Sequence, residues 1–192
     1  MSNPVWPMLA AERTALVDYL PTLSDGDWKC QSPCAGWTVH DLIAHVVAGA
    51  QTTPLNFGPG LIASGFSFDR LAARGIRQQG NANPTQLIAA LRARIDAKTQ
   101  PGKAYLGEIV VHSEDLRRAV GAPAGDHPAA HLIAVGDYYA GSGGPVGGKK
   151  RVAGLKLSAT DLEWTTGSGP EVEGPLVALI MATCGADSRS TS

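Results

Sequence analysis

Residues 107–121 read GEIVVHSEDLRRAVG, in which apolar residues surround a polar stripe. At 100° per residue, Glu108, His112 and Asp115 lie within about 60° of one another on a helix, and Ile, Val and Leu take most other directions. A helix that is apolar nearly all round is usually buried. A buried carboxylate that stays ionised is costly unless it is paired or bound to a cation. We therefore expect a buried helix over about 103–120, closed by Gly121 and Pro123, whose polar side chains share a partner.

A metal ion is one such partner. Glu108 and His112 are four residues apart, so they project side by side and can chelate one ion, as in metal sites at the core of helix bundles. The best third ligand is His45, which borders the apolar face of the helix predicted for TVHDLIAHVVAG (38–49). A His/Glu/His set with open positions is typical of a catalytic metal site. Asp115, one turn beyond His112, is placed to orient an imidazole by a hydrogen bond without binding the ion itself.

A solvated face is the alternative interpretation of the same stripe. Glu-x-x-x-His pairs arise often by chance, and Arg117 and Arg118 could simply pair with the neighbouring acids. Spacing alone leaves both interpretations open.

Composition limits the class of protein. The chain has 192 residues, enough for one good-sized domain or a main domain with a small appendage. The 16 basic residues nearly balance the 17 acidic ones, which argues against a nucleic-acid binder and against a polybasic membrane-surface protein. No apolar run approaches the roughly 20 residues that span a bilayer, and the N-terminus does not resemble a secretory signal. With three cysteines and no C-x-x-C spacing, we expect a cytoplasmic protein with reduced, structural thiols.

The pattern along the chain predicts a mainly α protein. We expect helices over 7–20, 38–49, 68–77, 83 to about 100, 103–120 and 128–140, with a connecting loop before the third. Thr38 and Asp41 form a capping box for the second helix, and Asn83-Pro84 begins the fourth. After a Gly-rich linker, two strands and a final helix (170–185) form a small β-β-α piece. The predicted domains are therefore a bundle (1–140), a linker (141–150) and a C-terminal α/β subdomain (151–192).

The sequences of several of these segments resemble those of a known family. CQSPCAGWTVHDLIAHVVAG (30–49), followed by GEIVVHSEDLRRAVG, resembles the mycothiol-dependent maleylpyruvate isomerase family, within the DinB-like metal-binding four-helix superfamily. Residues 152–185 resemble the small C-terminal α/β piece of that family. The resemblance implies a DinB-like up-and-down four-helix bundle in which His45, Glu108 and His112 hold a divalent ion, typically zinc, with nickel or manganese as alternatives. It also implies mycothiol, a low-molecular-weight thiol, as cosubstrate.

The resemblance also implies a function. A bound metal converts a thiol to the nucleophilic thiolate near neutral pH, and the thiolate then either isomerises a cis double bond or is transferred to an electrophile. Where the family often has Gly-Arg near the last helix, this chain has Cys184-Gly185-Ala186, which favours an electrophile other than maleylpyruvate. The alternatives are a non-catalytic metal-binding module and a stress-related binding protein. A homodimer is expected on general grounds.

Overall fold

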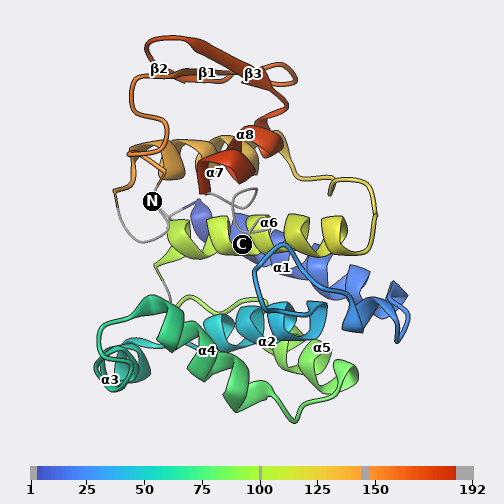
Figure 1. Cartoon of the computed structure of the whole chain (residues 1–192). Coiled ribbons are helices and arrows are strands. Elements are labelled where there is room, and N and C mark those ends of the chain that lie inside the picture. The colour runs from blue at the N-terminus through green and yellow to red at the C-terminus, as the bar shows by residue number, and fades with distance from the viewer. Residues whose placement is uncertain (1–3, 100, 144–147, 185–192) are drawn as a thin grey trace. The chain divides into compact units, whose positions relative to one another are not determined.

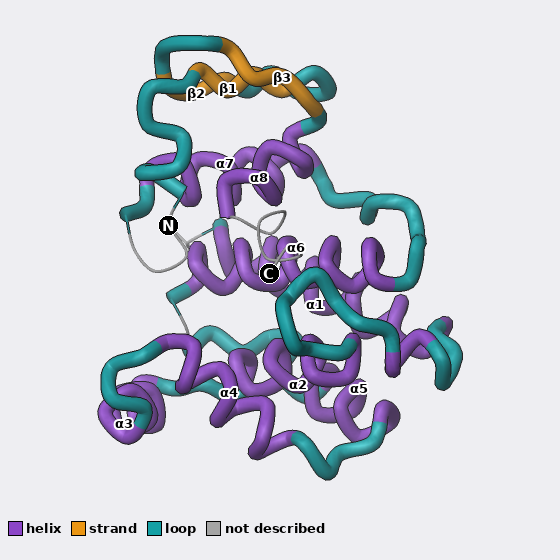
Figure 2. Tube along the Cα trace, viewed as in Figure 1, coloured by secondary structure: helices purple, strands orange, loops and turns teal. Residues whose placement is uncertain are grey.

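The chain is mainly helical, with a small three-stranded sheet near its C-terminus (Figures 1 and 2). This computed structural model describes residues 4–99, 101–143 and 148–184. The predicted fold class is confirmed. The chain divides into two compact units, Met1–Ala124 and Gly125–Ser192. The domain boundaries drawn from the sequence stay predictions, and the middle of the predicted linker and Gly185-Ala186 lie outside the described residues.

Four helices build the core of the first unit: α1 (Val5–Tyr19), α2 (Val39–Ala50), α5 (Pro84–Arg92) and α6 (Gly102–Ala119). Helix α1 packs on α5 and α6, and α2 packs on the same two helices (Figure 1). Two short 3-10 turns, η1 (Leu20–Thr22) and η2 (Asp27–Lys29), follow α1. The fully buried apolar side chains of this core come from all four helices: Leu9, Val17, Leu42, Ile43, Val47, Leu87, Leu91, Leu106, Val110 and Leu116.

The starts of α2 and α5 follow from their capping residues. The Asp41 N–H donates to Thr38 Oγ1 at 3.2 Å, and the Thr38 N–H donates to Asp41 Oδ2 at 3.0 Å, which is the predicted capping box. Asn83 caps α5 directly before Pro84, also as predicted. Because a cap fixes where a helix begins, it also fixes which side of α2 carries His45, two turns further on.

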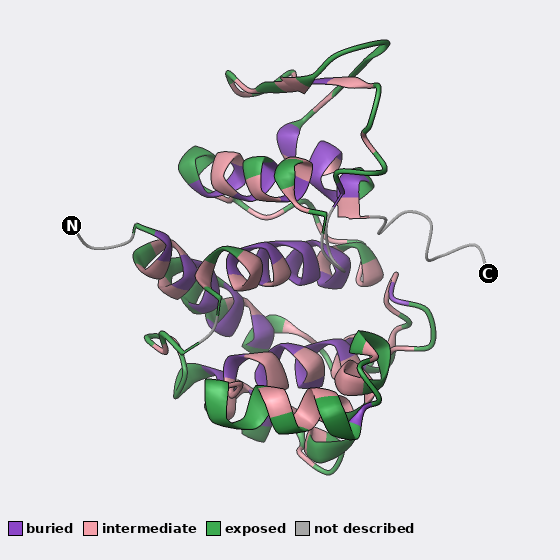
Figure 3. Ribbon diagram, turned by 90° about the vertical axis from the view of Figure 1, so that its left-hand side faces the viewer, coloured by how far each residue is buried: buried purple, intermediate pink, exposed green. Residues whose placement is uncertain are grey.

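Helix α6 contains a long buried segment. Most of its residues from Leu106 to Leu116 are buried, including polar ones (Figure 3). It lies so close to α1 that a Cβ added at Gly102 would sit 2.5 Å from Val5 Cγ1. After α6, Gly121 takes a left-handed conformation with φ of 67°, which favours glycine.

Two outer helices, α3 (Pro54–Ala63) and α4 (Phe68–Gln79), contain no buried residues. Helix α4 lies against α2, where a Cβ added at Gly75 would be 2.9 Å from the Ala48 Cβ. The sequence predicted a loop where α3 forms. Pro54 fits the first turn, where its missing N–H costs nothing, and Thr53 and Asn56 supply a capping box.

The second unit contains α7 (Ala129–Gly141), β1 (Lys156–Ala159), β2 (Thr165–Gly167), β3 (Glu171–Gly174) and α8 (Leu176–Cys184). The strand order is β2-β1-β3; β1 is antiparallel to β2 and parallel to β3. Helix α8 packs on α7 and on the sheet.

Strand β3 was not expected, because its residues were assigned to the final helix. Pro175 disfavours the helical conformation for the residue before it, and parallel pairing with β1 satisfies the backbone of β3. Within the described ranges, no helix is long and apolar enough to cross a membrane.

Candidate metal centre

The three side chains predicted as metal ligands meet between two helices of the first unit. His45 projects from α2, and Glu108 and His112 project from α6. Glu108 Oε2 lies 3.4 Å from His45 Nε2 and 3.4 Å from His112 Nε2. One ligand atom from each residue lies within 4.8 Å of the other two. The structure therefore brings all three side chains together, including His45, which is 63 positions from Glu108 in the sequence.

The spacing of these atoms fits a divalent ion. A tetrahedral zinc site with bonds of about 2.0–2.1 Å to nitrogen and oxygen has ligand–ligand edges of about 3.3–3.4 Å. The two imidazole rings are nearly perpendicular, with centroids 5.0 Å apart. A cavity of about 20 Å³ adjoins all three residues, which is room for one water-sized ligand. The set thus offers three ligands and an open position.

Asp115 lies on the far side of the His112 ring. His112 Nδ1 is 3.1 Å from Asp115 Oδ2, where the ring N–H donates to the carboxylate. A hydrogen bond at Nδ1 leaves Nε2 as the ligand nitrogen and fixes the plane of the ring. Asp115 is only 1% exposed, so this carboxylate acts inside the protein core.

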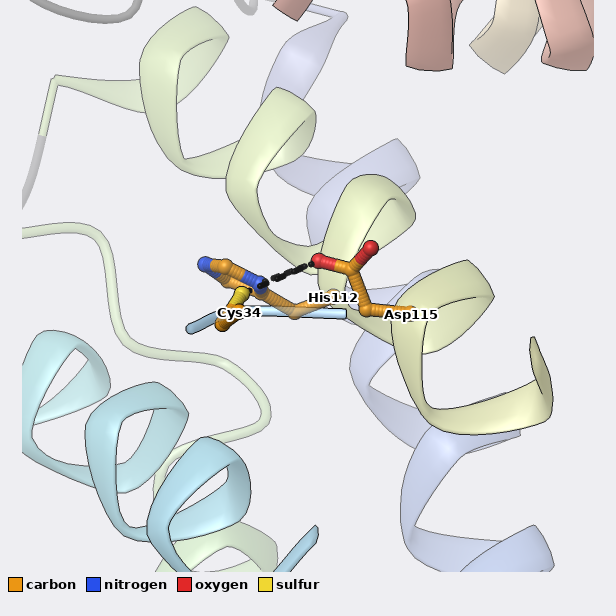
Figure 4. A group of neighbouring side chains, drawn as sticks. All are labelled: Cys34, His112 and Asp115. Atoms are coloured by element: carbon orange, nitrogen blue, oxygen red, sulfur yellow. Dashed lines mark hydrogen bonds and ion pairs between the residues drawn. The ribbon is translucent and has the colours of Figure 1, made fainter. Parts of the chain in front are cut away.

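A second group of potential ligands shares His112. Cys34, His112 and Asp115 are all buried and also lie within ligand distance of one another (Figure 4). Cys34 and Asp115 do not line the cavity, and Cys34 Sγ is hydrogen-bonded to Asp115 Oδ2 at 3.4 Å. Because all three members of the His45/Glu108/His112 group line the cavity, that group is the better candidate for an exchangeable metal ion.

Residues 9–102 match the family model described as mycothiol maleylpyruvate isomerase N-terminal domain. This segment, just under half of the chain, carries the N-terminal domain of that family. The matched residues include His45 and end before Glu108. Solved structures of the mycothiol-dependent maleylpyruvate isomerase, and of a histidine-to-alanine mutant of it, each share 18% identity with this chain. Each superposes with a TM-score of 0.62, covering 95% of this chain and 88% of the other, which establishes the shared fold. No curated protein matches the sequence.

Four further residues surround the candidate ligands of this mycothiol maleylpyruvate isomerase N-terminal domain without having been singled out as site residues. Trp37 lies over His45, with ring centroids 5.0 Å apart, and Cys34 contacts Asp115. Arg13 and Tyr105 line the cavity. Tyr105 stands three residues before Glu108, so helical spacing alone could have suggested it. The other three come from α1 and from the loop before α2, and no sequence spacing relates them to the ligands.

Two of the three candidate ligands have strongly shifted pKa values, because the three side chains lie so close together. Burial raises the pKa of Glu108, but hydrogen bonds from His112 and His45 outweigh it and hold that pKa well below its ordinary value of 4.5. Burial lowers the pKa of His112, but hydrogen bonds to Asp115, Cys34 and Glu108 outweigh it and raise that pKa well above 6.5. Without metal, the centre is therefore a buried imidazolium beside a carboxylate.

This charge pair predicts opposite pH dependences for the metal-free and zinc-bound protein. The raised pKa of His112 stabilises the metal-free fold below about pH 6.5, and this stability is lost as pH rises through the raised pKa. The lowered pKa of Glu108 stabilises the fold above about pH 4.5, and this is lost as pH falls through the lowered pKa. A zinc ion bound at His112 would displace the His112 proton, so we expect zinc binding to strengthen as pH rises.

Thermal unfolding between pH 6 and 9 measures this difference. With a chelator, we expect the melting temperature of wild type to fall relative to that of His112→Gln as pH rises. With zinc, we expect the wild-type melting temperature to rise instead, relative to its own chelated sample. If the melting temperature changes with pH in the same way with and without zinc, the idea that zinc and the His112 proton compete for one site is contradicted.

Proposed function

We propose that this chain is a divalent-metal-dependent enzyme that uses a small thiol, mycothiol in its family, on an electrophilic substrate. The proposal is supported mainly by the convergence of His45, Glu108 and His112 at a cavity, in a chain of this family. Zinc suits two imidazoles and one carboxylate, and nickel or manganese remains an alternative. A divalent ion in this position supplies the positive charge that keeps a thiol in its thiolate form near neutral pH.

The protein's own residues have separate tasks in this proposal. His45 and His112 offer neutral nitrogen ligands from two helices, and Glu108 adds the negative charge that offsets part of the ion's charge. Asp115 holds His112 by its other nitrogen. The Trp37 ring lies 5.0 Å from the His45 ring and 6.5 Å from the His112 ring, so it shields both imidazoles on one side. Burial of this kind excludes competing water from the ligands.

The reaction is an isomerisation or a thiol transfer, and the two differ in what happens to the thiol. An isomerase returns the thiol after the double bond has rotated, whereas a transferase consumes one thiol for each electrophile. The sequence lacks the family's Gly-Arg near the last helix, which favours a substrate other than maleylpyruvate. Cytoplasmic location and a homodimer stay predictions.

An assay with mycothiol tests the proposal. Zinc-loaded protein is incubated with mycothiol and, in turn, with maleylpyruvate, activated alkenes, alkyl halides and epoxides, while free thiol and each electrophile are followed. We expect turnover with at least one electrophile, and at least a 100-fold loss in Glu108→Gln, which removes the ligand charge but keeps the shape. His40→Gln is the matched control, because His40 lies on α2 but is bonded to the Ala82 carbonyl.

A non-catalytic metal-binding module is the second candidate. The small cavity favours it, because about 20 Å³ is room for one water-sized ligand beside the three residues. Firm zinc binding without turnover of any electrophile would replace the enzyme proposal with this one. Absence of zinc binding would overturn both.

A further inference from the structure

The loop before α2 is tied into a fixed shape. Gln31 and Thr38 form an isolated antiparallel bridge at its base, and the Ser32 N–H donates to the Trp37 carbonyl at 2.8 Å. Gly36 turns the chain with φ of 78°, a conformation that favours glycine. Cys34, at the tip of this loop, is therefore held in place by backbone hydrogen bonds and by the capped start of α2.

Cys34 directs its sulfur to the carboxylate that holds His112. Cys34 Sγ–H donates to Asp115 Oδ2 at 3.4 Å, and His112 Nδ1–H donates to the same oxygen at 3.1 Å (Figure 4). Cys34 is 5% exposed, His112 6% and Asp115 1%, so solvent reaches none of the three freely. In the part of the chain that the structure describes, the other oxygen, Oδ1, has no hydrogen-bond partner.

Two donors on one oxygen decide how the carboxylate is turned. With the thiol present, Oδ2 faces both Cys34 and His112, while Oδ1 points away. Without the thiol, the imidazole is the only hydrogen-bond donor to this carboxylate among the described residues, and the two oxygens become nearly equivalent. The carboxylate can then rotate, and the His112 ring, which it holds by Nδ1, loses its fixed plane. His112 Nε2 would no longer be held toward Glu108 and His45.

We propose that Cys34 is a positioning residue for the metal centre: its thiol fixes Asp115, and Asp115 fixes the ligand nitrogen of His112. This inference rests on the proposed metal site and adds to it a residue from a separate loop. It assigns the buried thiol a task distinct from packing and from nucleophilic chemistry. Cys34 is buried and is not among the residues that line the cavity, which fits such a task because a positioning group needs no access to substrate.

Zinc affinity, measured by competition with a chromophoric chelator, tests the proposal. Loss of an outer partner of a ligand typically costs about 10–100-fold in metal affinity. We expect Cys34→Ala to bind zinc about tenfold more weakly than wild type. Cys34→Ser, which keeps a donor, should stay within about twofold. Cys30→Ala is the matched control, because the Cys30 thiol contacts the Gly26 carbonyl instead, and its zinc affinity should not change.

A double-mutant cycle with Asp115→Asn separates positioning from general loosening of the fold. If Cys34 acts through Asp115, then Cys34→Ala costs no further zinc affinity in the Asp115→Asn background. Melting temperatures of the chelated variants report stability separately. Should Cys34→Ala not fold, Cys34→Val, which fills the thiol's volume without a donor, takes its place.

The outcomes are distinct. Unchanged zinc affinity in Cys34→Ala, equal losses in Cys34→Ala and Cys34→Ser, or additive losses in the cycle would overturn this inference and leave the metal site standing. A wild type that binds no zinc would overturn both. A tenfold loss that serine restores and that disappears in the Asp115→Asn background supports the positioning role.

Discussion

Replacing His112 with alanine should abolish the thermal stabilisation that we expect zinc to give to this protein. A ligand that binds only the folded state at 100 times its dissociation constant adds about 2.7 kcal/mol to the free energy of unfolding. For a chain of this length, that corresponds to about 5–10 °C in melting temperature. We expect wild type to gain this much and His112→Ala to gain nothing, as measured by thermal unfolding with and without zinc.

Each variant is compared with its own chelated sample, since His112→Ala also removes a buried partner of Asp115 and lowers stability by itself. His40→Gln should keep the full zinc shift, because His40 lies on the same helix as His45 but is bonded to the Ala82 carbonyl. A zinc shift that persists in His112→Ala would disprove both ligand groups, because His112 belongs to each of them.

Glu108→Gln distinguishes the two groups that share His112. Glu108 belongs only to the group with His45, whereas Cys34 and Asp115 belong only to the other. We expect Glu108→Gln to lose the zinc shift and Cys34→Ser to keep it. The reverse pattern would move the ion to the Cys34 side of the imidazole ring.

The convergence of the three candidate ligands could be predicted, because helical spacing is local and the segments that resemble the family are short. Glu108 and His112 are one turn apart, and a polar pair inside an apolar helix is costly unless it has a partner. His45 could be chosen because it borders the apolar face of its helix. The surroundings could not be predicted: Cys34 and Trp37 reach the site from a loop whose shape depends on backbone hydrogen bonds, and thiol spacing suggested only a packing role.

Helix α3 and strand β3 were not predicted, because their formation depends on more than local sequence. Helix α3 contains Gly58, Pro59 and Gly60, which weaken any local helix signal, and it forms after the capping residues at its start. Strand β3 is four residues long and alternates Glu-Val-Glu, and its pairing with β1 is set by tertiary structure, not by local preference. The capped helix α2, with its continuous apolar face, was predicted to within about a residue, whereas α5 ends at Arg92 and not near residue 100 as expected.

The burial of Arg13 and its hydrogen bonds could not be predicted from the sequence. A single arginine in an amphipathic helix normally lies in solvent, yet Arg13 is 2% exposed. Its Nη1 donates to the carbonyls of Arg94, Ile95 and Ala97 at 2.9, 3.2 and 2.9 Å. These carbonyls belong to the turn after α5, which leads toward α6. Burial lowers the pKa of Arg13 and nearby Tyr105 and Asp96 oppose this, but a guanidinium remains charged at neutral pH.

Arg13→Met should therefore lower the free energy of unfolding by about 3 kcal/mol, measured by urea unfolding of the chelated protein. A hydrogen bond to a charged group contributes about 1.5–3 kcal/mol, and the three bonds share one nitrogen, so their sum stays near the upper value. Methionine fills much of the volume without a donor, which leaves the loss of these bonds as the main change.

Arg92→Met is the matched control for that loss. Arg92 Nη2 lies 3.5 Å from Asp18 Oδ1, but both side chains are more than half exposed, and such pairs contribute less than about 1 kcal/mol. Equal losses in the two variants would contradict the role of Arg13 in tying α1 to the turn. In that case the Arg13 hydrogen bonds would not help to position α6. The buried apolar face of α6 and its close contact with α1 at Gly102 would then set the position of α6 and of Glu108 on it.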